Sequence, residues 1–188
     1  MKSDSLREYC MQEAIVNVLI DVCSKESLNR CASILPSATS QISSLEQLVS
    51  ELGAVPNVGQ TSHPIRQMRD FIRLRDRFRD FTRDYIRRCC DLIEDLTKFK
   101  LAPVRKVNVK NMPLGPAILE LKRSGLSEDL VEKLTVFNTK VYRVAKHEMP
   151  QEDRHMYSVA DAVAVTFVCL DLAREISSHI SSVSQIAP

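Results

Sequence analysis

The sequence predicts an all-α fold, a bundle of four to five main helices with one long central helix and one short irregular or extended insertion. Three observations support this class. The chain has only four glycines. Its apolar residues recur at three- and four-residue spacing, and Ser or Asp residues stand where helices would begin. A length of 188 residues suits one domain spanning residues 1–188. We expect irregular loops at about 36–43, 53–63 and 102–113.

Composition excludes several classes of protein. Hydrophobic residues make up 44% of the chain and the net charge is only +2, which excludes wholesale disorder. The longest apolar run, residues 162–170, lies between Asp161 and Asp171 and is too short to span a membrane. Glu8, Gln12 and Glu13 interrupt any signal-peptide core. We therefore expect a cytoplasmic protein with no membrane partner.

The first half of the chain predicts three helices before a loop. The first covers about Ser5 to Ser24, and a short second one runs from Lys25 until Pro36 ends it. A third begins at Ser44, which together with Gln47 resembles a capping box. Glycine and proline residues between 53 and 64 then predict an irregular loop.

The longest predicted helix begins at Pro64 and reaches Phe99 or Leu101. Its apolar residues follow a seven-residue series, flanked by further apolar positions, and we expect this stripe to contact neighbouring helices along its whole length. The helix is therefore predicted to be the spine of the bundle. The members of the series are Phe71, Phe78, Tyr85, Leu92 and Phe99.

The last third of the chain predicts one extended or irregular stretch and three helices. Valines alternate with polar residues between 102 and 113, and a short helix over 116–123 is stopped by Gly125. Ser127 caps the next helix, which reaches about His147. Ser158 and Asp161 form a capping box for a final, nearly all-apolar helix through about Ile180.

The six cysteines show no spacing typical of a metal site, and we expect reduced thiols that fill apolar space. No phosphate-binding glycine loop, zinc-protease motif, nucleophile elbow or calcium loop is present in the sequence. Glu94 and Asp95 stand as isolated carboxylates on the long helix. The sequence therefore predicts neither a metal site nor a cofactor.

A basic band fills the middle of the chain. Residues 61–110 carry 14 bases and 7 acids, a net of +7, while residues 1–60 (4 and 7) and 111–188 (8 and 10) are acidic. The arginines of the long helix are candidates for contacts with RNA or a partner. Four of these nine arginines follow an aspartate by three residues (Asp70–Arg73, Asp76–Arg79, Asp80–Arg83 and Asp84–Arg87), and Arg88 follows Asp84 by four. These spacings favour a paired, solvated surface instead, and both interpretations stay open. Arg75 falls within the apolar stripe and so needs a carboxylate, partner or ligand. The candidates are Arg75, Arg79 and Arg83.

A second cluster of cations lies near the end of the penultimate helix. Lys140, Arg143 and His147 are three and four residues apart, which places them on one face, and the next loop adds Arg154 and His155. A histidine beside two cations can act as general acid or base on a phosphodiester while the cations stabilise phosphorane charge. A histidine at a helix C-terminus is equally typical of a simple cap.

Residues 127–182 resemble the HEPN domains, small helical bundles of prokaryotic toxin–antitoxin, defence and RNA-processing systems. The resemblance rests on the helix with Asn138 that ends in Ala145-Lys-His147, and on the Ser158-Val-Ala-Asp-Ala162 start of the last helix. It implies a dimer that cleaves RNA without metal, using an arginine and a histidine separated by four to six intervening residues. His147 matches that histidine. Lys140 stands where the arginine would be, and Arg143 lies one position too close.

The sequence thus supports three functions. The first is a HEPN-like module, non-catalytic or weakly active, that forms a homodimer and binds RNA, a cognate antitoxin or another protein. The second is an active metal-independent endoribonuclease with His147, Arg143 and Lys140 as its catalytic residues. The third is a protein-interaction scaffold with no nucleic-acid role.

Overall fold

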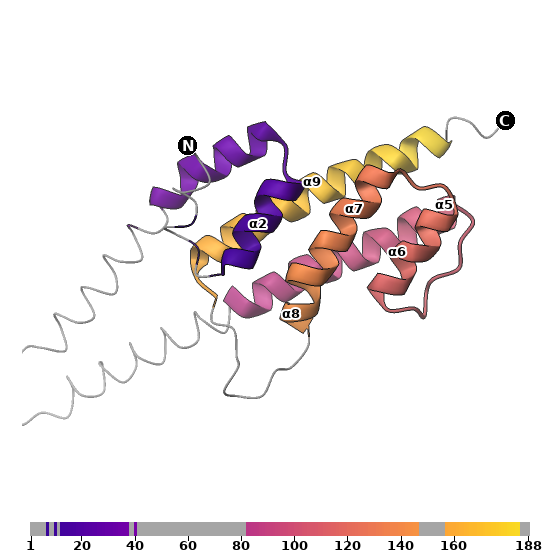
Figure 1. The fold of residues 1–188 in the computed structure, drawn as a ribbon, viewed down its shortest axis with the longest axis horizontal. Helices are drawn as coiled ribbons and strands as arrows, with labels where there is room; N and C mark the ends of the chain where they lie inside the picture. The colour runs from indigo at the N-terminus through magenta and orange to yellow at the C-terminus, as the bar shows by residue number, and fades with distance from the viewer. Residues whose placement is uncertain are drawn as a thin grey trace, which may run out of the picture.

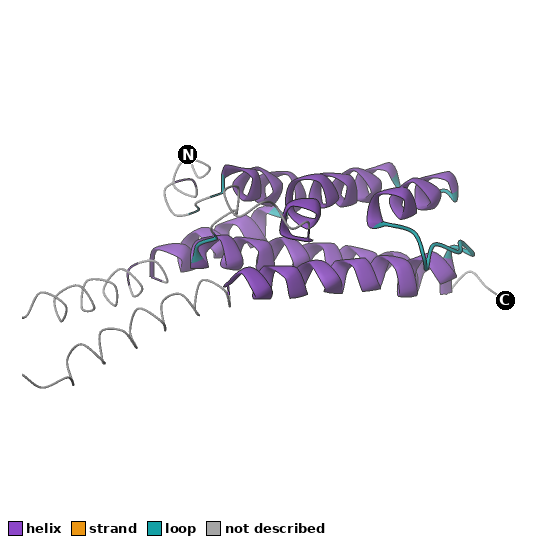
Figure 2. Ribbon diagram, turned by 90° about the horizontal axis from the view of Figure 1, so that it is seen from below, coloured by secondary structure: helices purple, strands orange, loops and turns teal. Residues whose placement is uncertain are grey.

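The computed structural model describes residues 7, 10, 12–37, 40, 82–146 and 157–184. In these ranges the regular structure is helical and contains no strand, which confirms the all-α class. The helix over 82–95 and α9 (Val159–Ser184) run side by side along the back of the bundle in Figure 1. Figure 2 shows, from a perpendicular direction, the second group of helices that packs against them, among them α2 (Glu13–Val22) and α7 (Glu128–Phe137).

Two aspartates of α9 hold the N-terminal ends of two other helices. The backbone N–H of Gln12, which precedes α2, donates to Asp161 Oδ1 at 3.1 Å. Ten residues further along α9, Asp171 accepts from the backbone N–H of Ser24 at 2.8 Å and from the Ser27 hydroxyl at 2.8 Å, at the start of the helix over 25–37. A carboxylate at a helix N-terminus accepts hydrogen bonds from unpaired N–H groups, and its negative charge interacts favourably with the positive end of the helix dipole. These contacts align both N-terminal helices along α9.

The predicted capping box of α9 is confirmed. The backbone N–H of Asp161 donates to the Ser158 hydroxyl at 3.1 Å, and the backbone N–H of Ser158 donates to Asp161 Oδ2 at 2.6 Å. Asp161 is fully buried. One carboxylate therefore starts α9 through Oδ2 and holds α2 through Oδ1.

The turn between α6 (Leu114–Arg123) and α7 also follows its sequence signals. Gly125 adopts a φ of +84°. The backbone N–H of Leu126 donates to the carbonyl of Leu121 at 3.1 Å, and this hydrogen bond closes the C-terminal end of α6. Ser127 then accepts from the backbone N–H of Leu130 at 3.4 Å as the cap of α7. Both helix boundaries match the prediction to within two residues.

The core lies where α2, α7, α9 and the helix over 82–95 meet. The penultimate helix contributes a buried apolar stripe of Leu130, Leu134, Phe137, Val141 and Ala145. Fully buried side chains from the other helices complete this core, including Ile15, Leu19, Ile86, Ile93, Val165 and Leu172. All six cysteines are free thiols, and Cys31, Cys90 and Cys169 are buried among the apolar side chains.

Three predicted helix ends are wrong. The second helix continues through Pro36 to Ser37. The central helix does not end at Leu101 but widens into η1 (Leu96–Leu101), a π-helical segment, and continues through α5 (Ala102–Val104). α9 reaches Ser184 rather than Ile180, whereas residues 107–113 are irregular, one of the two forms predicted for this insertion. The predicted helices over 44–52 and 64–81 lie outside the described residues.

The expectation for the central apolar stripe is also wrong in its described half. Tyr85, Leu92 and Phe99 are 36%, 49% and 45% exposed. The opposite side of the same helix is buried instead, through Ile86, Cys90, Ile93, Thr97 and Leu101. The helix carries two apolar sides, and the described part of the bundle buries only one. We call the uncovered surface, formed by Tyr85, Leu92, Phe99 and the 45%-exposed Leu170 of α9, the outer face.

Among the described helices, none combines the length and the apolar character needed to cross a lipid bilayer.

Candidate functional site

Three of the eight predicted site residues lie in the described part of the chain: Arg83, Lys140 and Arg143. The other predicted residues lie outside it, so the structure does not place them relative to one another. These are Arg75, Arg79, His147, Arg154 and His155. The structure therefore tests the cationic part of the site and leaves its imidazole a prediction.

Lys140 and Arg143 are exposed at the C-terminal end of the penultimate helix. This end is not a regular α-helix, because η2 (Asn138–Tyr142) is π-helical before α8 (Arg143–Lys146) begins. The backbone N–H of Arg143 donates to the carbonyl of Asn138, five residues earlier. One extra residue in a turn shifts the following side chains by roughly 100° around the axis. The α-helical spacing that placed Lys140, Arg143 and His147 on one face therefore does not apply across η2.

Within the described residues, neither Lys140 nor Arg143 forms an ion pair. Other cations of the bundle are engaged: Lys98 pairs with Glu94, Lys133 with Asp129 and Glu175, and Lys146 with Asp91 and Glu94. An anionic ligand can bind exposed cations that lack a carboxylate partner without first breaking an ion pair. Lys140 and Arg143 form such a pair of available charges, which we call the cationic ridge.

Lys146 anchors α8 to the central helix. Its ammonium pairs with Asp91, lies 3.8 Å from Glu94 Oε2 and sits 5.5 Å from the centre of the Tyr142 ring. The Tyr142 hydroxyl donates to Glu94 Oε2 at 2.6 Å, and burial together with this bond raises the pKa of Tyr142. The prediction that Glu94 is an isolated carboxylate is wrong, because its three partners come from two helices.

Two arginines lie where the central helix, α8 and α9 reach the same end of the bundle (Figure 1). Arg87 Nε donates to the backbone carbonyl of Ala145 at 2.8 Å, which satisfies an otherwise unpaired carbonyl at the end of α8. Burial raises the pKa of Tyr157 to about 12, although the positive charges of Arg83 and Arg87 act to lower it. The predicted pairing of Asp84 with Arg87 or Arg88 does not occur among the described contacts. Arg87 is thus a structural residue, whereas Arg83 is half-buried near Tyr157.

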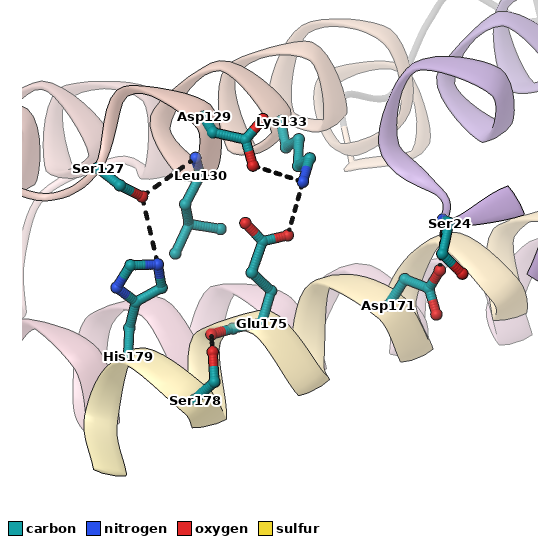
Figure 3. A network of polar contacts seen from close by, with 9 residues as sticks. All are labelled: Ser24, Ser127, Asp129, Leu130, Lys133, Asp171, Glu175, Ser178 and His179. Atoms are coloured by element: carbon teal, nitrogen blue, oxygen red, sulfur yellow. Dashed lines mark hydrogen bonds and ion pairs between the residues drawn. The ribbon is translucent and has the colours of Figure 1, made fainter. Parts of the chain in front are cut away.

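A second polar cluster connects α7, α9 and the end of α2, and sequence reasoning missed it (Figure 3). Lys133 Nζ lies 2.6 Å from Asp129 Oδ2 and 3.0 Å from Glu175 Oε2, and the Ser127 hydroxyl lies 3.2 Å from His179 Nε2. Of these groups, Lys133 and Glu175 border an open depression of about 460 Å³, together with Ser24 and Asp171. Only the Asp129–Lys133 pair, four residues apart, could be read from the sequence.

The chemistry available in the second cluster is limited. Burial alone would raise the pKa of Asp171, but hydrogen bonds from Ser24 and Ser27 outweigh it and lower the pKa. Lys133 has a raised pKa, since its carboxylate neighbours outweigh its burial. Both shifts stabilise the ordinary charged forms, which suits helix packing rather than proton transfer. Among the described residues, no group of three His, Cys, Asp or Glu side chains could hold a metal ion.

Comparison with known proteins gives no match: no family model fits the chain, and neither the curated proteins nor the solved structures contain a similar one.

Proposed function

We propose that this chain is a HEPN-like helical module that dimerises and binds RNA or a protein partner, as a component of a prokaryotic defence or RNA-handling system, with little or no catalytic activity of its own. The observation that carries the RNA-binding part is the cationic ridge, Lys140 and Arg143, two exposed cations without an ion pair in the described structure. Phosphate groups are the polyanionic partner that such charges favour.

The basic band of the sequence supports this choice over a purely solvated surface. Along the chain, Arg83 directly follows the arginine-rich residues 61–81. Asp84 does not neutralise Arg87 or Arg88 as helix spacing suggested, so local pairing removes less positive charge than expected. A low intrinsic activity follows from the residues themselves, because a lysine at position 140 replaces the planar, bidentate guanidinium of the family pattern.

RNA affinity as a function of salt tests the proposal. We expect a single-stranded RNA to bind the protein with an affinity that falls steeply between about 50 and 200 mM salt. The double variant Lys140→Ala/Arg143→Ala should bind more weakly and show a log–log salt slope smaller by roughly 1.4, about 0.7 for each lost phosphate contact. The matched control is Lys110→Ala/Lys122→Ala, which removes the same charge from exposed positions elsewhere and should change the slope by less than half as much.

Three outcomes would change the proposal. No measurable binding by the wild type at about 50 mM salt would remove RNA from it. Equal losses in the two double variants would assign binding to net charge rather than to the ridge. RNA cleavage that disappears in His147→Ala would establish the endoribonuclease, with His147 as its acid or base.

A protein-interaction scaffold without a nucleic-acid role is the second candidate, and one observation favours it. The outer face exposes four large apolar side chains on two neighbouring helices. Clusters of this kind mark protein interaction sites more often than nucleic-acid sites. The same RNA titration separates the two functions, since a scaffold gives no salt-dependent signal.

A further inference from the structure

The outer face consists of large apolar side chains that are exposed on the surface of the bundle. Seven large hydrophobic side chains are exposed among the described residues, and four of them are Tyr85, Leu92, Phe99 and Leu170. The other three, Ile20, Ile34 and Leu119, lie singly on three different helices. Single exposed apolar residues are ordinary in a protein surface, whereas a group on one surface needs an explanation.

Contacts between the two helices place Tyr85, Leu92 and Leu170 on one surface. The Tyr85 hydroxyl lies 2.8 Å from Thr166 Oγ1, and the Cys169 thiol donates to the carbonyl of Cys89 at 3.7 Å. The central helix and α9 are therefore parallel, with position 85 level with 166 and position 89 level with 169. Leu170 follows directly after Cys169, so it lies about level with Leu92, within a turn of helix. The two exposed leucines form the middle of the face, between Tyr85 and Phe99.

The charges that border the face are self-complementary. Arg88 and Asp95 are both exposed on the central helix, and within the described residues neither has an ion-pair partner. They are seven residues apart, about 10 Å along the axis, too far to pair with each other. Arg88 lies four residues before Leu92 and Asp95 three after it, while Tyr85 and Phe99 lie seven residues before and after.

This symmetry selects one occupant for the face. When a second central helix is placed antiparallel across the first about Leu92, each Arg88 meets an Asp95 and the leucines meet at the centre; all three positions lie in the regular α-helix over 82–95. A parallel arrangement would instead place Arg88 opposite Arg88 and Asp95 opposite Asp95, which is unfavourable. An unrelated partner would not explain why the charges on either side of Leu92 are complementary to those of a second, antiparallel copy. A two-fold interface requires such self-complementarity.

We propose that the outer face binds the outer face of a second copy of this chain, with the two central helices antiparallel and a two-fold axis near Leu92. This inference deepens the dimerising part of the proposed function and does not depend on RNA binding. It assigns aromatic and leucine side chains to the apolar centre and the Arg88–Asp95 pairs to the rim, the ordinary arrangement of a protein interface.

The oligomeric state of variants tests the face. We expect sedimentation of the wild type to show a dimer, and Leu92→Glu to raise its dissociation constant about 30-fold or more, the effect of losing an interface hot spot. Leu119→Glu is the matched control, because Leu119 is 57% exposed on α6, away from the face, and should leave the dimer unchanged. Circular dichroism of each variant checks that the helices are retained.

Charge reversal tests the antiparallel arrangement. Arg88→Glu and Asp95→Arg should each weaken the dimer, and the double variant should restore it, because the reversed pair again places opposite charges together. Leu92→Cys should form a disulfide between two chains under mild oxidation, since the axis passes near it, whereas Tyr85→Cys alone should add nothing to the wild-type background.

The outcomes separate the inference from the function on which it rests. A wild type that stays monomeric at about 100 μM, where even a weak specific interface shows association, overturns both the outer-face dimer and the dimerising part of the proposed function. A dimer that survives Leu92→Glu overturns only the use of this face. A dimer lost in Leu92→Glu but not restored by the double charge reversal overturns the antiparallel arrangement. RNA affinity, measured with the ridge variants, is independent of all three.

Discussion

Both sides of the central helix carry large apolar residues in the sequence, but only one side is buried in the structure. On the inner side Ile86, Ile93 and Leu101 are fully buried, whereas on the outer side Leu92 and Phe99 are almost half exposed. Hydropathy therefore marks both sides as able to pack but does not decide which one does. The described helices bury the inner side and leave the outer side exposed.

α9 shows the reverse of the usual preference for buried apolar and exposed charged side chains. Asp161 is fully buried there while Leu170 is 45% exposed. The carboxylate stays inside because Gln12 and Ser158 donate hydrogen bonds to it, which offsets the loss of water. Whether a side chain of the central helix or of α9 is buried therefore depends on the groups that contact it. Three measurements test this statement.

The largest expected effect compares two adjacent residues of the central helix. Ile93→Ala should lower the free energy of unfolding by about 2–5 kcal/mol, because it opens a cavity in a fully buried site. Leu92→Ala should lower it by less than about 1 kcal/mol, since an exposed side chain loses little contact. Urea denaturation at low protein concentration, where a dimer contributes least, measures both. Equal losses would mean that the inner and outer sides do not differ.

A smaller effect is expected at Asp171, the carboxylate that begins the helix over 25–37. Asp171→Asn should cost about 1 kcal/mol of stability at pH 7, the usual value of a helix cap. The folded state lowers the pKa of Asp171, so its contribution is present above the unfolded pKa of about 3.9 and is lost as the pH falls through the folded pKa. Wild type and variant should therefore converge in stability below pH of about 4.

Asp84→Asn is the control for that measurement, because Asp84 is exposed and has no ion pair within the described residues. It should change stability little at any pH. A gap between wild type and Asp171→Asn that stays constant from pH 7 to pH 3 would mean that the charge of the carboxylate does not matter to the cap.

The smallest effect concerns two adjacent thiols at the boundary of the two sides. A hydrogen bond with the Cys169 thiol, aided by Tyr85, outweighs burial and lowers the pKa of Cys89 to about 7. Burial raises the pKa of Cys90 to about 12. At pH 7 iodoacetamide should therefore modify Cys89 much faster than Cys90, with a rate that rises through a midpoint near the pKa of Cys89. Peptide mapping by mass spectrometry measures both rates.

Cys169→Ala removes the main cause of this shift and should move the midpoint for Cys89 upward, toward the ordinary value of about 8.5. A midpoint that stays in place would assign the shift to Tyr85, and equal rates at Cys89 and Cys90 would contradict the difference in burial between them.

The candidate site was only partly predictable. Lys140 and Arg143 could be found from charge and spacing, and both are exposed as a ligand-binding ridge requires. Their spacing could not be predicted, because η2 adds a residue to one turn and no residue type marks a π-helical segment. The pairing of Glu94 with Lys98, four residues later, could have been predicted from the sequence, but its contact with Tyr142, 48 residues away, could not.

By itself the sequence determined the helical class and the helix boundaries that depend on neighbours three or four residues away: the Ser158–Asp161 capping box, the Ser127 cap and the left-handed Gly125. Only the tertiary structure decided which side of the central helix is buried, and which helices Asp161 and Asp171 hold. Capping and turn geometry are short-range, so the local residues fix them. The choice between two apolar sides depends on the shapes and polar groups of helices distant in the chain, and no short stretch of sequence contains that information.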